Sequence, residues 1–484
     1  MGTSMKKNKN YKMLAIGLLA FTVLSAATPA HAQYSLLYSF GVSSATDAMD
    51  PEGPIAQGED GSLYSTAIDG GATNWGAIWK ITPAGKERVI YSFCPLPLTC
   101  AGDDGNSPIV GLTLRPDGHF FGTASFSDGT NNPNILFDVS PTGSFTKLYT
   151  APIGTALNIP IWGPDGAFYG INGGGSDDCG GIYRLSVTFT VIHNFDNPHG
   201  CGPIGLVLGT DGSFYGTTDP DGTSNAGVFF RLTYRPGLAA LYSELANISA
   251  TLGAVSGNLI EGSDGNFYGF TLAANNGPRG SIFKVTPGGV FTTLHTLNGT
   301  TDGAFIGALT LASDGNLYGT ADLGGAEGGG GFGTLFQVTP AGTYTVLYRF
   351  TGPNSGAAPI AIVQHTNGLL YGITVDGGAF SGTTYECALS HLNGCGVVFS
   401  WNGNLPAFVS TVQLMGAVGS EVEILGQGFT SSSIVSFNGV PATATVQSGT
   451  SLHATVPVGA TTGSITVTTS TGTLTSNRQF VVLP

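Results

Sequence analysis

The chain has 484 residues, of which 76 are glycine, and a formal net charge of −14 from 16 basic and 30 acidic side chains. Nucleic acid and anionic membranes are poor partners for such a chain, because both attract clustered lysine and arginine. The acidic surface keeps an extracellular protein soluble, and a divalent cation or a neutral glycan suits it better as a partner.

The first 32 residues have the parts of a bacterial-type signal peptide. Four lysines between residues 6 and 12 precede an apolar stretch from about Met13 to Ala27, and Ala30-His31-Ala32 follows the small-residue rule for cleavage. The stretch is short for a membrane span, and no cysteine follows it to take a lipid. We therefore expect residues 1–32 to be removed, and the mature chain to be secreted, to the cell surface, the periplasm or the medium, without membrane insertion.

A turn signature recurs seven times along the next 340 or so residues, at spacings of 46 to 57 residues. Its members are Asp60-Gly61, Asp117-Gly118, Asp165-Gly166, Asp211-Gly212, Asp264-Gly265, Asp314-Gly315 and Asn367-Gly368, each followed by an apolar or aromatic pair. Such a dipeptide between apolar runs predicts a β-hairpin, here with a type I′ turn in which both central residues have positive φ.

Two further signatures keep phase with this turn: a strand often ended by Thr-Pro-x-Gly, and an aromatic strand such as Val346 to Phe350. Each repeat therefore holds four short strands, A to D, which is the pattern of a propeller blade rather than of a solenoid coil. The mature chain opens on a D-type strand, Leu36 to Phe40, whereas the seventh repeat ends after its C strand, Gly396 to Trp401. We expect an all-β, seven-bladed β-propeller over residues 33–405, with the N-terminal strand completing the last blade.

The repeated patterns Leu-Tyr-Ser-Phe, Asp-Gly-x-Leu-Tyr-Gly-Thr and Gly-Thr-x-Phe-x-Val-Thr-Pro-x-Gly resemble the GloVer-type (Gloeo/Verruco) tandem repeat of exported bacterial proteins. The resemblance covers roughly residues 34 to 403. It implies a surface or secreted propeller and no defined activity.

After Pro406 the composition shifts to valine, threonine, serine and glycine, with several short alternating strands that suit one β-sandwich. Residues 419–429, 435–439, 456–460 and 463–467 resemble an IPT/TIG domain, which has an immunoglobulin-like fold. For residues 406–484 this resemblance implies a spacer or adhesion module.

Strand order decides which loops share a face. The A–B and C–D turns are tight and lie on one face, the tight-turn face. The B–C and D–A connections lie on the other face, the long-loop face, where binding is expected.

All six cysteines fall in these long loops, and an exported chain should pair them. Their proximity suggests Cys94 with Cys100, Cys387 with Cys395, and Cys179 with Cys201.

The candidate binding residues also belong to the long loops. Aromatic rings without an evident place in the repeat, and two histidines, are Trp75, Phe126, Phe332, Phe380, Tyr385, His199 and His391. Among the loop acids, Asp219 and Asp221 could begin a calcium cage, although loop acids more often form Asx turns. We expect no other cofactor.

These residues support a non-catalytic binding or adhesion protein whose long-loop face takes a glycan or a surface protein. Two alternatives stay open: an extracellular polysaccharide lyase or glycoside hydrolase, for which sequence cannot choose a carboxylate pair, and a structural matrix component without a discrete ligand.

Overall fold

The computed structural model describes residues 33–483 except 43, 45, 95–103, 109, 126–133, 153, 174–178, 197–199, 220–226, 236, 249–252, 273–278, 327–330 and 380–393. Within these ranges all regular structure is β-strand. No helix of the described chain is long and apolar enough to span a membrane. The predicted signal peptide lies outside the described residues.

The first 28 strands of the described chain form seven four-stranded antiparallel sheets, the repeat sheets 1 to 7. Sheets 1 to 3 contain β2 (Ala48–Gln57), β3 (Leu63–Gly70), β4 (Ala77–Ile81) and β5 (Glu87–Ser92); β6 (Leu112–Leu114), β7 (Phe120–Ala124), β8 (Ile135–Val139) and β9 (Phe145–Thr150); and β10 (Ile161–Trp162), β11 (Phe168–Asn172), β12 (Gly181–Leu185) and β13 (Phe189–Asn194). Sheets 4 and 5 contain β14 (Cys201–Leu208), β15 (Phe214–Asp219), β16 (Val228–Thr233) and β17 (Leu241–Asn247); and β18 (Val255–Glu261), β19 (Phe267–Thr271), β20 (Ser281–Val285) and β21 (Phe291–Thr296). Sheets 6 and 7 contain β22 (Ala304–Leu311), β23 (Leu317–Leu323), β24 (Thr334–Val338) and β25 (Tyr344–Arg349); and β26 (Ala357–Gln364), β27 (Leu370–Asp376), β28 (Val397–Trp401) and β1 (Tyr34–Ser39).

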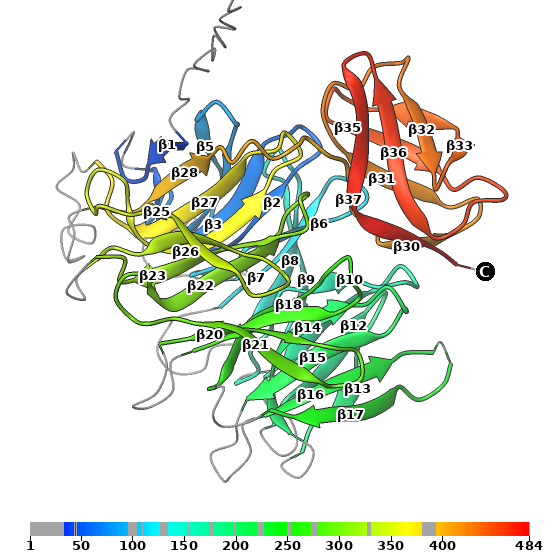
Figure 1. Ribbon diagram of the computed structural model, residues 1–484, viewed down its shortest axis with the longest axis horizontal. Helices are drawn as coiled ribbons and strands as arrows, with labels where there is room; N and C mark the ends of the chain where they lie inside the picture. The colour runs from blue at the N-terminus through cyan, green and yellow to red at the C-terminus, as the bar shows by residue number, and fades with distance from the viewer. Residues whose placement is uncertain are drawn as a thin grey trace, which may run out of the picture.

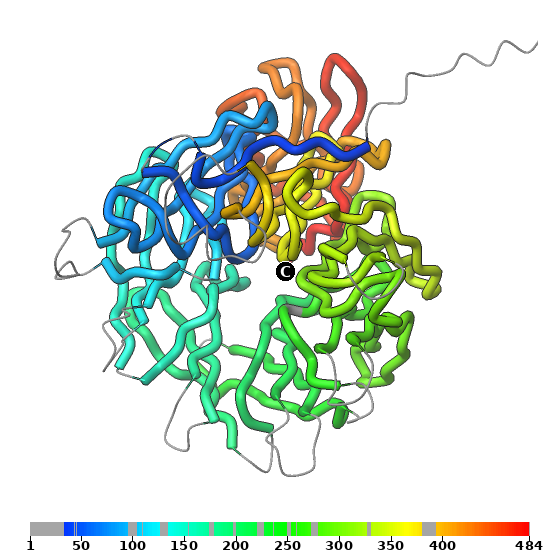
Figure 2. Tube along the Cα trace, turned by 90° about the vertical axis from the view of Figure 1, so that its left-hand side faces the viewer, coloured from blue at the N-terminus to red at the C-terminus, as the bar shows by residue number. Residues whose placement is uncertain are grey.

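These sheets follow one another around a ring in chain order (Figure 2). The arrangement is consistent with a β-propeller. The predicted pairing of the N-terminal strand with the seventh repeat is confirmed: β1 runs antiparallel to β28, with Tyr34 opposite Trp401 and Ser39 opposite Val397. The first and last strands of the repeat region therefore share one sheet.

Apolar packing joins each repeat sheet to the next. Seven hydrophobic clusters of the described residues each combine side chains of two consecutive sheets, and one of them joins sheet 7 to sheet 1 through Tyr371, Phe40 and Trp79. Glycine in the Tyr-Gly motif makes room for the aromatic ring of the neighbouring C strand: a Cβ on Gly372 would lie 2.3 Å from the Phe399 ring. Each sheet packs against one neighbouring sheet on each of its two faces, so no repeat can bury its apolar surface alone.

The Asp-Gly hairpins form at all seven positions, but their turns are not type I′. In sheet 1 the Gly61 amide bonds to the Gly58 carbonyl, and only Gly61 has positive φ, whereas Asp60 does not. This is a type I turn followed by a left-handed glycine. The aspartate instead caps the turn, because its carboxylate accepts from the Ser62 amide and from the Tyr64 hydroxyl. The motif's tyrosine and aspartate are thus partners.

The outer D strands of neighbouring sheets are linked by stacked rings. Tyr34 of β1 lies 4.2 Å from Tyr348 of β25 and nearly parallel to it. Four other junctions carry the same arrangement, in the pairs Tyr91–Phe145, Tyr149–Phe189, His193–Tyr242 and His295–Tyr344. His193 and His295 thus take the place that tyrosine holds in sheets 1, 2, 6 and 7, whereas sheet 4 has Ala246 there.

The C-terminal part, residues 406–483, forms two sheets. One contains β29 (Ser410–Thr411), β31 (Glu421–Leu425), β35 (Ser451–Thr455) and β34 (Ala444–Val446), and the other contains β30 (Met415–Ala417), β37 (Gly472–Leu483), β36 (Gly463–Thr469), β32 (Ile434–Phe437) and β33 (Val440–Ala442). Their inner faces share one apolar cluster that includes Val422, Phe437 and Ile465.

This C-terminal part lies against the tight-turn face of the ring (Figure 1). Glu59 next to the first Asp-Gly turn accepts bonds from Ser448 and Thr450, and Thr366 at the seventh turn donates to the Gly426 carbonyl. Arg478 pairs with the buried Glu261 of β18 at 3.0 Å. The long-loop face lies on the opposite side.

We predict that Tyr34→Ala lowers the free energy of unfolding by about 2 to 4 kcal/mol. The variant loses the stack on Tyr348 and the 2.6 Å bond from the Tyr34 hydroxyl to the Ser355 carbonyl, both of which close the ring. Urea denaturation measures the effect. The control is Leu148→Ala, at a D-strand position that is 40 % exposed, and it should change the free energy of unfolding by less than about 0.5 kcal/mol. Equal urea midpoints for the two variants would contradict the role of ring closure in stability.

Candidate functional site

The structure places only some of the predicted site residues. Trp75, Phe332 and Asp219 are described; Phe126, His199, Phe380, Tyr385, His391 and Asp221 lie outside the described residues. The calcium prediction for Asp219 and Asp221 is therefore untested, and the two histidines cannot be located relative to the acids.

The cysteines agree with the predicted pairing as far as they are described. Cys179 and Cys201 form a disulfide that connects the B–C loop of sheet 3 to the first strand of sheet 4. Cys94 and Cys395 are also disulfide-bonded, while the partners predicted for them, Cys100 and Cys387, lie outside the described residues.

Trp75 and Phe332 occupy one equivalent position of the repeat. Each precedes a left-handed glycine, Gly76 or Gly333, in a B–C loop, and each carbonyl accepts a bond from the amide that opens the next sheet, Ser107 or Ala358. Ser107 and Ala358 themselves have positive φ and precede a proline. The main chain at this position is therefore a joint between sheets, and the side chain is left to vary.

The side chains at this position differ in exposure. Trp75 is 38 % exposed, whereas Phe332 is half-buried. In other repeats the position holds Cys179, Arg279 or Cys395. The equivalence of Trp75 and Phe332 was not predicted from the sequence, although the glycine that follows each of them was a signal for it.

Phe332 lines a cleft of about 820 Å³ on the long-loop face, between the B–C loop of sheet 6 and its outer strand. The rest of the described lining is Thr301, Gly325, Ala326, Gly331, Arg349, Phe350 and Thr351. The half-buried Phe332 ring and the exposed Arg349 side chain offer stacking and charge-assisted hydrogen bonds together, while the Phe350 ring is buried beneath them. Such a cleft can hold a sugar ring or a side chain of a protein partner.

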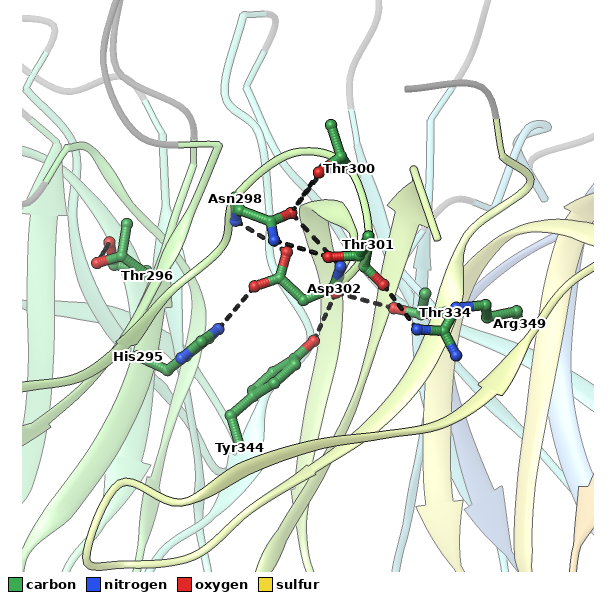
Figure 3. Close-up of polar contacts among 10 residues, drawn as sticks. His295, Thr296, Asn298, Thr300, Thr301, Asp302, Thr334, Tyr344 and Arg349 are labelled. Atoms are coloured by element: carbon green, nitrogen blue, oxygen red, sulfur yellow. Dashed lines mark hydrogen bonds and ion pairs between the residues drawn. The ribbon is translucent and has the colours of Figure 1, made fainter. Parts of the chain in front are cut away.

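The loop beside this cleft is held by an internal network (Figure 3). Asp302 accepts from the Asn298 amide at 2.9 Å and contacts Nε2 of His295 at 2.9 Å, and its carbonyl accepts from the Tyr344 hydroxyl at 2.6 Å. Arg349 donates to the Thr301 carbonyl at 3.1 Å. Two cleft residues, Thr301 and Arg349, are thereby fixed to each other.

The His295–Asp302 pair resembles a catalytic dyad, but the repeat explains it. In sheet 7 the Tyr38 hydroxyl donates to Asp47, which also accepts from the Val42 amide. Tyr91 and Asp104 repeat the arrangement at the end of sheet 1, with the Cys94 amide. A D-strand hydroxyl or imidazole that fixes a loop aspartate is therefore a building element of these repeats. The amides that these aspartates accept from precede them in the chain, so the bonds are not those of an Asx turn.

A second group of acids gathers where the inner strands meet the long-loop face. Asp50 has positive φ, and its carboxyl bonds to that of Asp69, while Glu52 and Asp376 lie close enough to repel it. Burial, and then these neighbours, raise the pKa of Asp50. The pKa of Asp322 rises to about 7, first from burial and then from the charge of Glu52. Carboxyls that keep a proton near neutral pH are groups of the kind that general acids use.

The repeats match a known sequence family. The sequence model of the Gloeobacter/Verrucomicrobia repeat matches residues 156–385 and 241–437, which together span more than half of the chain. The chain belongs to this repeat family. No curated protein matches the sequence.

Several solved structures are distantly similar to this repeat protein. A gluconolactonase from Xanthomonas campestris aligns with 77 % of this chain and 89 % of its own, at 11 % identity and a TM-score of 0.37. The apo prolyl oligopeptidase B from Galerina marginata aligns with 78 % of this chain and 56 % of its own, at 13 % identity and a TM-score of 0.45. A luciferin-regenerating enzyme aligns with 75 % of this chain and 94 % of its own, at 13 % identity and a TM-score of 0.36. At this distance the activities of these enzymes do not transfer to the repeat protein.

The buried acids make stability depend on pH. Folded Asp322 holds its proton up to about pH 7, whereas an unfolded aspartate releases it near pH 4, so the folded state binds more protons between these values. Stability should therefore fall as pH rises from 4 to 7. We predict that Asp322→Asn removes this part of the slope and stabilises the protein at pH 7.5 by about 1 to 3 kcal/mol.

Urea denaturation of both proteins at several pH values measures the slope. The control is Asp264→Asn, because the turn bonds of Asp264 lower its pKa and its loss should cost stability above pH 4 instead. Parallel pH profiles for wild type and Asp322→Asn would contradict the assignment.

Proposed function

We propose that this protein is an exported binding or adhesion protein that holds an extracellular glycan or a surface protein on its long-loop face. In this proposal the seven repeat sheets are the blades of a seven-bladed β-propeller over residues 33–405. Residues 406–484 are an IPT/TIG-type immunoglobulin-like domain, and residues 1–32 are a signal peptide. The seven clusters between consecutive sheets, with sheet 7 packed on sheet 1, support the blade count.

The cleft of about 820 Å³ at Phe332 and Arg349 carries the binding proposal. It joins the half-buried ring of Phe332, which belongs to the long loops, to the guanidinium of Arg349, which is held by the Thr301 carbonyl. The opposite face is occupied by the C-terminal part, which contacts the turns at Glu59, Thr366 and Glu261. A partner therefore has the long-loop face open to it and finds there a pre-formed recess.

We predict that Phe332→Ala and Arg349→Gln each weaken binding of the partner at least tenfold, because a buried ring or a charge-assisted contact is worth about 1 to 2 kcal/mol or more in an interface. A glycan array and a panel of bacterial and host surface proteins, probed with the exported chain, identify the partner. Titration of that partner against the variants then measures the loss.

Arg88→Gln is the matched control, since Arg88 is an exposed arginine on the outer strand of sheet 1, away from the cleft. Binding should be unchanged in it. Absence of any partner in both screens, or equal affinity in all three variants, would contradict the proposal. Shortening of a polysaccharide during incubation would favour the lyase or hydrolase alternative, with Asp50 and Asp69 as the carboxyls to replace.

A further inference from the structure

Three potential metal ligands meet where the C-terminal part contacts repeat sheet 1. Glu59 follows β2 in the first A–B turn, and Glu423 of β31 lies directly opposite His453 of β35 in the same sheet. One donor atom from each of the three side chains lies within 4.8 Å of the other two. The cluster therefore draws on two parts of the chain that are some 360 residues apart.

Glu423 is the buried member of the cluster. Its side chain is 1 % exposed, Oε1 accepts from the Ser451 hydroxyl at 2.6 Å, and Oε2 has no hydrogen-bond partner. A carboxylate oxygen at such a place needs a proton or a cation to offset its lost hydration.

His453 presents its ring toward that oxygen. Nε2 contacts Oε2 of Glu423 but has no hydrogen-bond partner, while Nδ1 lies 3.2 Å from Oε1 of the exposed Glu421. In the tautomer that carries its proton on Nδ1, facing Glu421, the ring presents the lone pair of Nε2 toward Glu423. A carboxylate behind one imidazole nitrogen and a free lone pair on the other is the usual environment of a metal-bound histidine.

Glu59 completes the set from the repeat side. Its main-chain carbonyl is fixed by Ser448 at 3.0 Å and Thr450 at 2.6 Å, so the docked C-terminal part holds the turn that carries Glu59. The three donors are one imidazole nitrogen and two carboxylate oxygens.

We propose that Glu59, Glu423 and His453 bind a divalent ion of the zinc type, which links the C-terminal part to repeat sheet 1. An imidazole nitrogen with two carboxylates suits Zn²⁺ and related transition metals, whereas Ca²⁺ and Mg²⁺ prefer ligand sets made of oxygen alone. The ion binds both Nε2 and Oε2, which are in contact in this structure and move apart to admit it. Because its ligands come together only in the folded protein, binding stabilises the junction.

The test uses the whole exported chain, purified without a histidine tag, stripped with a chelator and titrated with Zn²⁺ at pH 7.5. We expect about one tightly bound Zn²⁺ per chain, a thermal midpoint several degrees higher than in the stripped protein, and an anomalous-scattering peak between the three side chains. His453→Gln and Glu59→Gln should each weaken Zn²⁺ binding at least tenfold.

Two variants separate a metal site from an ordinary ion pair. Glu421→Gln removes the carboxylate behind His453 but no ligand, so it should still bind one Zn²⁺, more weakly than wild type. His295→Gln removes a histidine of the long-loop network, far from the cluster, and should bind Zn²⁺ as wild type does. Equal Zn²⁺ binding by wild type and His453→Gln, or a thermal midpoint indifferent to zinc and chelator, would overturn the proposal. The three side chains would then form a proton-linked ion pair only.

Discussion

The burial of apolar surface between consecutive sheets is the constraint on which this molecule depends. Every repeat sheet has aromatic and aliphatic side chains on both faces, and each of the seven clusters needs two sheets. A linear array would leave one face of the first sheet and one of the last in water. The ring closes instead, because β1 completes sheet 7 and Phe40 packs with Trp79 of sheet 1. Closure also leaves no unpaired end of the array.

The joints between sheets account for the recurring loop chemistry. At the joint of sheets 6 and 7, Phe332 supplies a carbonyl, Gly333 a left-handed turn, and Ala358 an amide. Because these bonds use the main chain, side chains at the joints are free to differ among repeats. This freedom explains how one position can carry a cystine in sheet 3, an exposed tryptophan in sheet 1 and a cleft-lining phenylalanine in sheet 6.

The two faces of the ring have different roles, because one carries tight turns and the other carries long loops. Tight turns give one even face, and the C-terminal part covers it with hydrogen bonds to Glu59 and Thr366, the Arg478–Glu261 pair and apolar contacts of Met415 and Leu425. The C-terminal part is therefore docked on the ring, unlike a spacer joined to it by a flexible linker. The long loops carry the cysteines and the Phe332 ring of the cleft, so variation there can alter binding without disturbing the ring of sheets.

Much of this could be predicted from sequence, because strand period and turn spacing are local signals. The Asp-Gly pairs indicated every hairpin, and the phase of Leu36 to Phe40 indicated closure. The type I′ expectation was wrong because the turn begins one residue earlier, at Gly58 instead of Glu59 in sheet 1, and only its last residue, Gly61, is left-handed. The cluster of Glu59, Glu423 and His453 had no local signal, since its members meet only through docking of the C-terminal part.

One measurement tests the central claim that the tight-turn face is covered and the long-loop face is open. Brief hydroxyl-radical oxidation of the whole exported chain, followed by peptide mass spectrometry, compares Met415 and Met49, which are 6 % and 4 % exposed, with Trp75, which is 38 % exposed. We expect slow oxidation of both methionines, because they are buried, and rapid oxidation of the exposed Trp75. Oxidation of Met415 as rapid as that of Trp75 would show that the C-terminal part is not docked on the ring and would contradict the account.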